Sequence, residues 1–281
     1  MSTSFARRRA ARPLQYLALA AYLVFLGFPL LWMLSSSFKS PQELASVGGG
    51  LLPSDPTFQN FADALERADL LQATWNSTRV ALGTTVLVIV LALPAAYALA
   101  RFRTRLRPVA NAWVLISQVF PVILVVIPLF LILRQFALVD SLVGLTLVHA
   151  VYALPFALWM LQAHISAIPR DVEEAGVMDG ANRVRILWSI VAPLLVPGLV
   201  ATAMFTLISS WNEFFFALVL IQDPAKNTLP LTLARFVGAE GQVQLGALAA
   251  ASLLATVPSL LFFAAVQRRL TSGLLSGAVK G

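Results

Sequence analysis

Four carboxylates gather in one short polar segment of this 281-residue chain, between two long apolar runs. Pro169 suits the first turn of a helix, and acidic residues directly after it are favoured by the positive N-terminal end of that helix. Gly180 then supplies a stop. The pattern predicts a short exposed helix of about ten residues, then a break and a second helix. Its carboxylates could bind basic groups of another protein. A loop that only connects two membrane spans would also be polar and could have the same charge. The four are Asp171, Glu173, Glu174 and Asp179.

Other reactive groups are sparse. The chain has no cysteine, which excludes disulfides, thiolate metal sites and thiol catalysis. No G-x-x-x-x-G-K-[ST], H-E-x-x-H or G-x-S-x-G motif occurs, so neither a phosphate-binding loop nor these hydrolase classes are indicated. His149 is the only ionisable side chain within an apolar run. A histidine in a membrane span is a functional candidate by default, but one unpaired histidine is a poor proton relay, so we favour a packing role.

The composition indicates a membrane protein. Hydrophobic residues make up 59% and charged residues 12% of the chain, against roughly 45–50% and about 25% in soluble domains. Six apolar runs, each about long enough to cross a bilayer, contain no Asp, Glu, Lys or Arg. We therefore predict an all-α membrane protein with about six transmembrane helices. The runs are residues 14–34, 80–100, 109–133, 142–161, 186–208 and 245–266.

The basic residues predict the orientation. Fourteen of the 20 Lys and Arg lie in the N-terminal segment, between the second and third runs, between the fourth and fifth, and after the sixth. The positive-inside rule then places both termini in the cytoplasm. The net charge of +7 is explained by membrane lipid headgroups, without nucleic acid. The chain divides into a cytoplasmic N-terminus (1–13), a transmembrane domain (14–266) with a cytoplasmic loop (164–185) and external loops (35–79 and 209–244), and a cytoplasmic tail (267–281).

The first external loop contains a helical pattern. Phe58, Phe61, Leu65 and Ala68 recur at helical spacing among acidic residues, which predicts a short amphipathic helix at the membrane surface. Polar residues also occur within the apolar runs, where they are compatible either with the lining of a pathway or with hydrogen bonds between helices. They include Asn111, Gln118, Thr146 and Tyr152. No substrate-contacting residue is predicted from them.

The acidic segment resembles the EAA loop of permeases from ATP-binding-cassette (ABC) importers. It reads EAGVMDGA over residues 174–181, and Pro193 follows at the family's spacing; Gly176 replaces the second alanine, and Ala192 replaces the usual leucine. The resemblance implies a coupling helix that docks in a cleft of a cytoplasmic ATPase. Acidic residues would pair with basic residues of the ATPase, and small residues would permit close backbone approach. The implied docking residues are Glu173, Glu174, Ala175, Gly176, Asp179, Gly180 and Ala181.

The rest of the chain is similar to the carbohydrate-uptake branch of that family, the MalG-like second permeases. The motifs, in family order, are SFKSPQEL at 37–44, NF at 60–61, NS at 76–77, PAAYALARF at 94–102, LPFALW at 154–159, WNEFFFAL at 211–218 and SGLLSGAVKG at 272–281. The resemblance implies the type I importer permease fold in a bacterial inner membrane, and a non-catalytic subunit that binds no cofactor itself.

The implied partners are a homologous second permease, two cytoplasmic ABC ATPases that carry ATP and Mg²⁺, and an extracytoplasmic sugar-binding protein. Residues 271–281 would reach toward the ATPase dimer, and residues 212–244 would contact the binding protein. The competing interpretation is a six-span ion-coupled carrier or channel that is not driven by ATP. That interpretation accounts for the hydrophobicity but not for the acidic helix.

Overall fold

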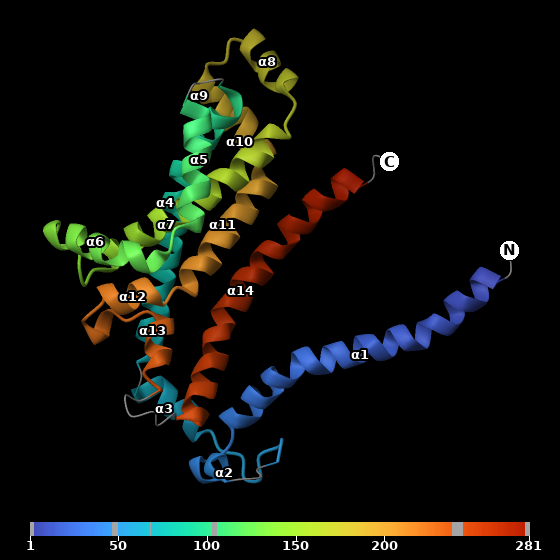
Figure 1. Ribbon diagram of the computed structural model, residues 1–281, viewed down its shortest axis with the longest axis vertical. Coiled ribbons are helices and arrows are strands. Elements are labelled where there is room, and N and C mark those ends of the chain that lie inside the picture. Colours follow the sequence, from blue (N-terminus) through green and yellow to red (C-terminus); the bar gives the residue numbers. More distant parts are fainter. Residues whose placement is uncertain (1–2, 47–49, 68, 103–105, 238–243, 279–281) are drawn as a thin grey trace. The chain divides into compact units, whose positions relative to one another are not determined.

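The structure, a computed structural model, describes residues 3–46, 50–67, 69–102, 106–237 and 244–278. Every regular element within these ranges is a helix (Figure 1). The chain divides into two compact units. The first comprises Met1–Leu70 with Leu233–Thr256, and the second comprises Leu71–Thr232 with Val257–Gly281.

The first unit is built around α1 (Thr3–Ser37), α2 (Pro41–Ala45), α3 (Gln59–Arg67) and the first part of α14 (Leu245–Ala278). From Gln15 to Ser37, α1 is apolar enough to cross a membrane. The amphipathic helix predicted in the first external loop is present as α3, while Ala68 lies outside the described residues. The Asn60 amide donates hydrogen bonds to the carbonyl oxygens of Ser37 and Lys39 at 3.0 and 2.8 Å, which ties α3 to the end of α1.

The second unit is a helical bundle centred on α7 (Leu142–Ser166). Both α5 (Leu106–Val119) and α11 (Val196–Trp211) pack against α7, and α4 (Leu70–Arg101) contributes to the same core. Buried alanines such as Ala92 and Ala157 line this core, and small residues let membrane helices approach closely. A second cluster contains Val80 of α4, Leu145 of α7 and the apolar face of α12 (Phe215–Leu220).

Short elements lie at the two ends of this bundle (Figure 1). The end that carries α8 (Arg170–Met178) also holds α9 (Arg183–Arg185), the π-helical segment η1 (Ile186–Val191) and α10 (Ala192–Leu194). The opposite end, which we call the outer end because it lies away from α8, holds α12, η2 (Pro224–Lys226) and α13 (Leu229–Ala234). Between α5 and α7, α6 (Val122–Gln135) runs across the bundle and contacts α12.

The predicted spans take two forms. Four helices are long and apolar enough to cross a membrane: Gln15–Ser37, Leu70–Arg101, Leu142–Ser166 and Leu245–Ala265. The other two runs are bent pairs, Arg107–Val119 with Val122–Gln135 at 103° and Arg183–Leu194 with Val196–Trp211 at 80°. Pro121 stands at the first break, and Pro193 and Pro197 flank the second, where the missing N–H groups weaken helix continuity. The all-α membrane fold is confirmed, with up to six spans if each bent pair counts as one.

Candidate functional site

The acidic segment forms the short helix that its sequence predicts. α8 covers nine residues, with Pro169 before it and Asp171 and Glu173 in its first turn. Gly180 has a φ of +77°, in the left-handed region, where glycine is tolerated best. The N–H groups of Gly180 and Ala181 bond back to the carbonyl oxygens of Val177 and Gly176 at 2.9 Å each. The turn satisfies the last carbonyls of α8 and sends the chain toward α9.

One face of α8 is turned away from the bundle. Glu174, Ala175, Asp179 and Gly180 are exposed, while Ala181 is half-buried. Met178, which is 87% exposed, and Val177 add apolar surface beside the carboxylates. Within the part of the chain that the structure describes, Glu174 forms no hydrogen bond or ion pair. This face combines charge with apolar side chains, the composition that a protein partner could bind.

The opposite face of α8 is bound to this chain. Glu173 Oε1 lies 2.6 Å from Arg101 Nε, and Glu173 Oε2 accepts a hydrogen bond from the Tyr97 hydroxyl at 2.8 Å. The Arg101 guanidinium also donates to the carbonyl oxygen of Ile168 at 2.8 Å. The side chains of Arg101 and Glu173 are only 8% and 12% exposed. We call Tyr97, Arg101 and Glu173 the α4–α8 strut.

Gly176 lies on the same inward face as Glu173, three residues further along the helix. It is buried, and a Cβ atom there would lie 2.5 Å from Cδ1 of Ile190 in η1. Of the seven residues expected to dock on an ATPase, Glu173 and Gly176 therefore contact their own chain. Within this chain, the charge of Glu173 serves a contact with α4, and the small size of Gly176 serves a contact with η1.

The sequence suggested that His149 is unpaired, but in the structure it has two partners. Its Nδ1 lies 2.7 Å from Ser210 Oγ, and its Nε2 lies 3.0 Å from Glu213 Oε2. Glu213 also accepts hydrogen bonds from the N–H groups of Phe216 and Ala217, at the start of α12. Both ring nitrogens are therefore engaged in a buried connection between α7 and the α11–α12 junction. This pairing cannot be predicted from the sequence, because Glu213 lies in a predicted external loop, outside the apolar runs.

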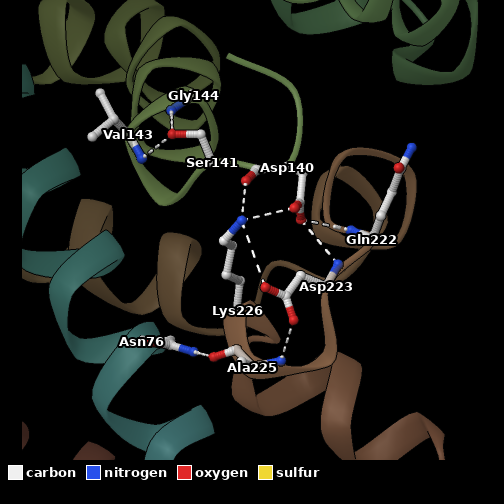
Figure 2. Close-up of polar contacts among 9 residues, drawn as sticks. All are labelled: Asn76, Asp140, Ser141, Val143, Gly144, Gln222, Asp223, Ala225 and Lys226. Atoms are coloured by element: carbon white, nitrogen blue, oxygen red, sulfur yellow. Dashed lines mark hydrogen bonds and ion pairs between the residues drawn. The ribbon is translucent and has the colours of Figure 1, made fainter. Parts of the chain in front are cut away.

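A second polar network joins two loops at the outer end (Figure 2). Asp140 Oδ1 accepts hydrogen bonds from the N–H groups of Gln222 and Asp223 at 3.0 Å each. Lys226 Nζ lies 2.7 Å from Asp140 Oδ2 and 3.7 Å from an Asp223 carboxylate oxygen. The backbone N–H of Asp223 and then the side-chain ammonium of Lys226, through their hydrogen bonds to the carboxylate, lower the pKa of Asp140 to about 2. The hydrogen bond to Asp140 raises the pKa of Lys226. We call Asp140, Asp223 and Lys226 the outer clasp.

The NS pair of α4 supports the same region. Asn76 Nδ2 donates hydrogen bonds to the carbonyl oxygens of Ala225 and Asn227 at 2.9 and 3.0 Å, and the first of these contacts is visible in Figure 2. The Ser77 hydroxyl accepts a hydrogen bond from the N–H of Leu229 at 2.8 Å. These two residues fix the backbone of η2 and the start of α13 against α4.

The polar residues singled out in the apolar runs have different surroundings. Thr146 donates a hydrogen bond to Leu142 of its own helix. Asn111 lines a cavity of about 300 Å³ between α5 and α7, together with Trp159, Gln162 and Ser166. Tyr152 lines a mainly apolar cavity of about 440 Å³. Among the described residues, no cluster of three or more His, Cys, Asp or Glu could hold a metal ion.

Comparison with known proteins identifies the family. Residues 88–274 match the family described as binding-protein-dependent transport system inner membrane component. A putative ABC transporter permease, ORF1 of Streptomyces antibioticus, is 52% identical over 229 residues, which cover 82% of this chain and 100% of the relative. The diacetylchitobiose uptake permease DasC of Streptomyces coelicolor is 36% identical over 263 residues, which cover 93% and 95% of the two chains.

A solved structure has the same fold. It is a bacterial ABC transporter involved in the import of the acidic polysaccharide alginate, and the match has a TM-score of 0.81 at 24% sequence identity, covering 95% of this chain and 98% of that one. The resemblance to carbohydrate-uptake permeases is confirmed, and the ion-coupled alternative is not supported. The chain therefore belongs to the binding-protein-dependent transport system inner membrane components, as a multi-pass, non-catalytic permease subunit of an ABC importer.

Proposed function

We propose that this chain and a homologous second permease form the pathway through which a sugar or oligosaccharide enters the cell. The named cargo of similar proteins supports this substrate class, since DasC takes its name from diacetylchitobiose uptake and the alginate transporter imports a polysaccharide. The cargo would be delivered by an extracytoplasmic sugar-binding protein. ATP and Mg²⁺ would bind to two cytoplasmic ATPases, and this chain would hold neither.

The observation that carries the proposal is the exposed face of α8. Glu174 and Asp179 project from a helix whose other face is fixed to the bundle. A helix held in this way can move the bundle when a partner moves it, whereas a free loop cannot. We assign Glu174, Ala175, Asp179, Gly180 and Ala181 to contact with the ATPase. ATP-driven closure of the ATPases would then shift the permease pair between inward and outward access, as a change in the populations of two states.

The orientation follows from charge. Arg101, Arg183 and Arg185 lie at the α8 end of the bundle, and the positive-inside rule places such residues in the cytoplasm. The outer end, with the outer clasp, would then face the external binding protein. Both termini would be cytoplasmic. Helix α14 extends to Ala278, and the last three residues of the tail lie outside the described residues.

Co-purification from native membranes tests the docking assignment. A tagged chain should bring down an ATPase and a second permease. Glu174→Lys should selectively reduce the ATPase, because a reversed charge repels the basic residues that the carboxylate would pair with. The matched control is Glu66→Lys, which reverses an exposed carboxylate on α3 and should leave both partners bound. Recovery of the tagged chain without any ATPase would overturn the proposed function. Full recovery of the ATPase with Glu174→Lys would overturn the assignment of the docking face and leave the rest of the proposed function standing.

A further inference from the structure

The two adjacent glutamates of α8 face in different directions and have different partners. Glu174 is exposed, whereas Glu173 is bound to Tyr97 and Arg101 of α4. We infer that the α4–α8 strut carries the movement of α8 to α4, so that Glu173 is a positioning residue and not an ATPase-docking residue. This inference rests on the proposed function, because it assumes that α8 docks on an ATPase.

The geometry of the strut suits the transmission of movement. Each carboxylate oxygen of Glu173 has its own partner, at 2.6 Å on Arg101 and at 2.8 Å on Tyr97. These partners are four residues apart and therefore lie on the same face of α4. Arg101 also holds the carbonyl oxygen of Ile168 at 2.8 Å, just before α8 begins. Because α8 is attached at two points, it cannot pivot about a single bond without breaking a contact.

Burial makes the strut resistant to separation. Both charged side chains are almost withdrawn from water, at 8% and 12% exposure. Removing one partner of such a pair leaves the other charge buried without compensation, which is strongly unfavourable. Pulling α8 away from α4 would break the two hydrogen bonds to Glu173 and the one to the carbonyl oxygen of Ile168, and hydrogen bonds that involve a charged group are stronger than neutral ones. The connection therefore opposes the separation of the two helices.

The contact between Gly176 and Ile190 complements the strut. It is an apolar packing contact between α8 and η1, and such contacts resist compression much more strongly than they resist separation. A push on α8 can therefore pass directly to η1, which belongs to the second bent pair. A pull on α8 requires an attractive connection, and the α4–α8 strut supplies one. The two contacts would allow movement in both directions of the transport cycle.

Distance measurement in the intact complex tests this inference. The chain has no native cysteine, so spin labels can be attached at Ala98→Cys on α4 and Val172→Cys on α8, both exposed positions and neither among the residues assigned to ATPase contact. We expect one narrow label distance that is the same without nucleotide and with ATP plus vanadate. Glu173→Gln should keep the ATPase bound but replace the narrow distance with a shifted or broad one in the trapped state. Tyr97→Phe, which removes one hydroxyl, should cause a smaller change of the same kind.

Glu174→Gln is the matched control, because it alters the adjacent, outward carboxylate. It should reduce the amount of bound ATPase and leave the distance between the labels unchanged. If Glu173→Gln instead releases the ATPase and preserves the label distance, Glu173 is a docking residue, and the inference fails while the proposed function stands. An unchanged distance in both Glu173→Gln and Tyr97→Phe would also overturn the inference. Absence of an ATPase from the unmodified complex would overturn the proposed function itself.

Discussion

Gly144, near the start of α7, occupies a position that admits no side chain. A Cβ atom there would lie 2.1 Å from the carbonyl oxygen of Leu138. That carbonyl belongs to a turn in which Ala137 and Asp140 both have left-handed backbones, with φ of 53° and 56°. Ser141 caps the helix by accepting hydrogen bonds from the N–H groups of Val143 and Gly144 (Figure 2). The turn therefore has little freedom to move away from an added methyl group.

We expect Gly144→Ala to destabilise the protein by ~1–3 kcal/mol, the usual cost of overpacking, and to lower its melting temperature in detergent. Gly27→Ala is the control, because no atom lies within 4 Å of the Cβ that it would add and alanine favours helix. Equal melting temperatures for the two variants would show that the turn can relax.

Single residues differ in how far the sequence reveals their role. The stop at Gly180 could be predicted, because its cause is local: the backbone turns there with a positive φ. The different roles of Glu173 and Glu174 could not be predicted, because they depend on which face of α8 contacts α4. The partner of Glu173, Arg101, is 72 residues away in the sequence. The pairing of His149 with Glu213 was missed for the same reason, since 64 residues separate them.

Among the connecting elements, the outer clasp is sensitive to pH. The pKa of Asp140 is lowered to about 2, below roughly 3.9 in an unfolded chain. A carboxylate whose pKa is lower in the folded chain than in the unfolded chain stabilises the fold at pH values above its unfolded pKa. This stabilisation is lost as the pH falls from about 4 through about 2. The carboxylate is 27% exposed, so solvent screens part of the effect.

We therefore expect Asp140→Asn to lower the melting temperature at pH 7 by a few degrees, ~2–4 °C. The gap between the variant and the unmodified protein should close as the pH is lowered toward 2. Asp55→Asn, at an exposed position of the first unit, is the control and should change little at any pH. Melting curves in detergent across this pH range provide the measurement, and a gap that persists at the lowest pH would contradict the assigned role of the carboxylate.

The helix breaks show a limit of prediction from sequence. Prolines occur in all six apolar runs, yet Pro94, Pro155 and Pro258 lie inside the continuous helices α4, α7 and α14. Among the described residues, the runs around Pro121 and Pro193 are the two that are broken into helix pairs bent by more than 40°. Whether a proline breaks a membrane helix depends on how neighbouring groups satisfy the freed carbonyls. That information lies in the packing, so the existence of the runs could be predicted but not their shape.

At the level of the complete chain, the orientation in the membrane can be tested with single cysteines. Asp55→Cys should react from outside intact cells with a membrane-impermeant maleimide, because the positive-inside rule predicts that residues 35–79 are external. Met178→Cys should react only after the membrane is permeabilised. The chain contains no cysteine of its own, so labelling has no background from it. Reaction in the opposite pattern would reverse the assigned orientation.

The composition was sufficient to predict a membrane protein with several helical spans, because six apolar runs without charged residues leave few alternatives. The motifs around residues 174–181 then led to the correct family. The cargo could not be deduced in this way, since neither the sequence nor the cavities between helices carry a feature that selects one sugar.

The polar contacts of the second unit also set the order in which it can be completed during synthesis. Glu173 is synthesised 72 residues after its partner Arg101, whereas Asn227 is synthesised 151 residues after its partner Asn76. At a synthesis rate of about 5–20 residues per second, the delay between Asn76 and Asn227 is roughly 8–30 s. The contacts at the α8 end can therefore close while the outer end is still incomplete. A ribosome that stalls before residue 222 would leave Asn76 without its partners Ala225 and Asn227, and Asp140 without its partners in residues 222–226, in a chain whose earlier membrane helices have already been made.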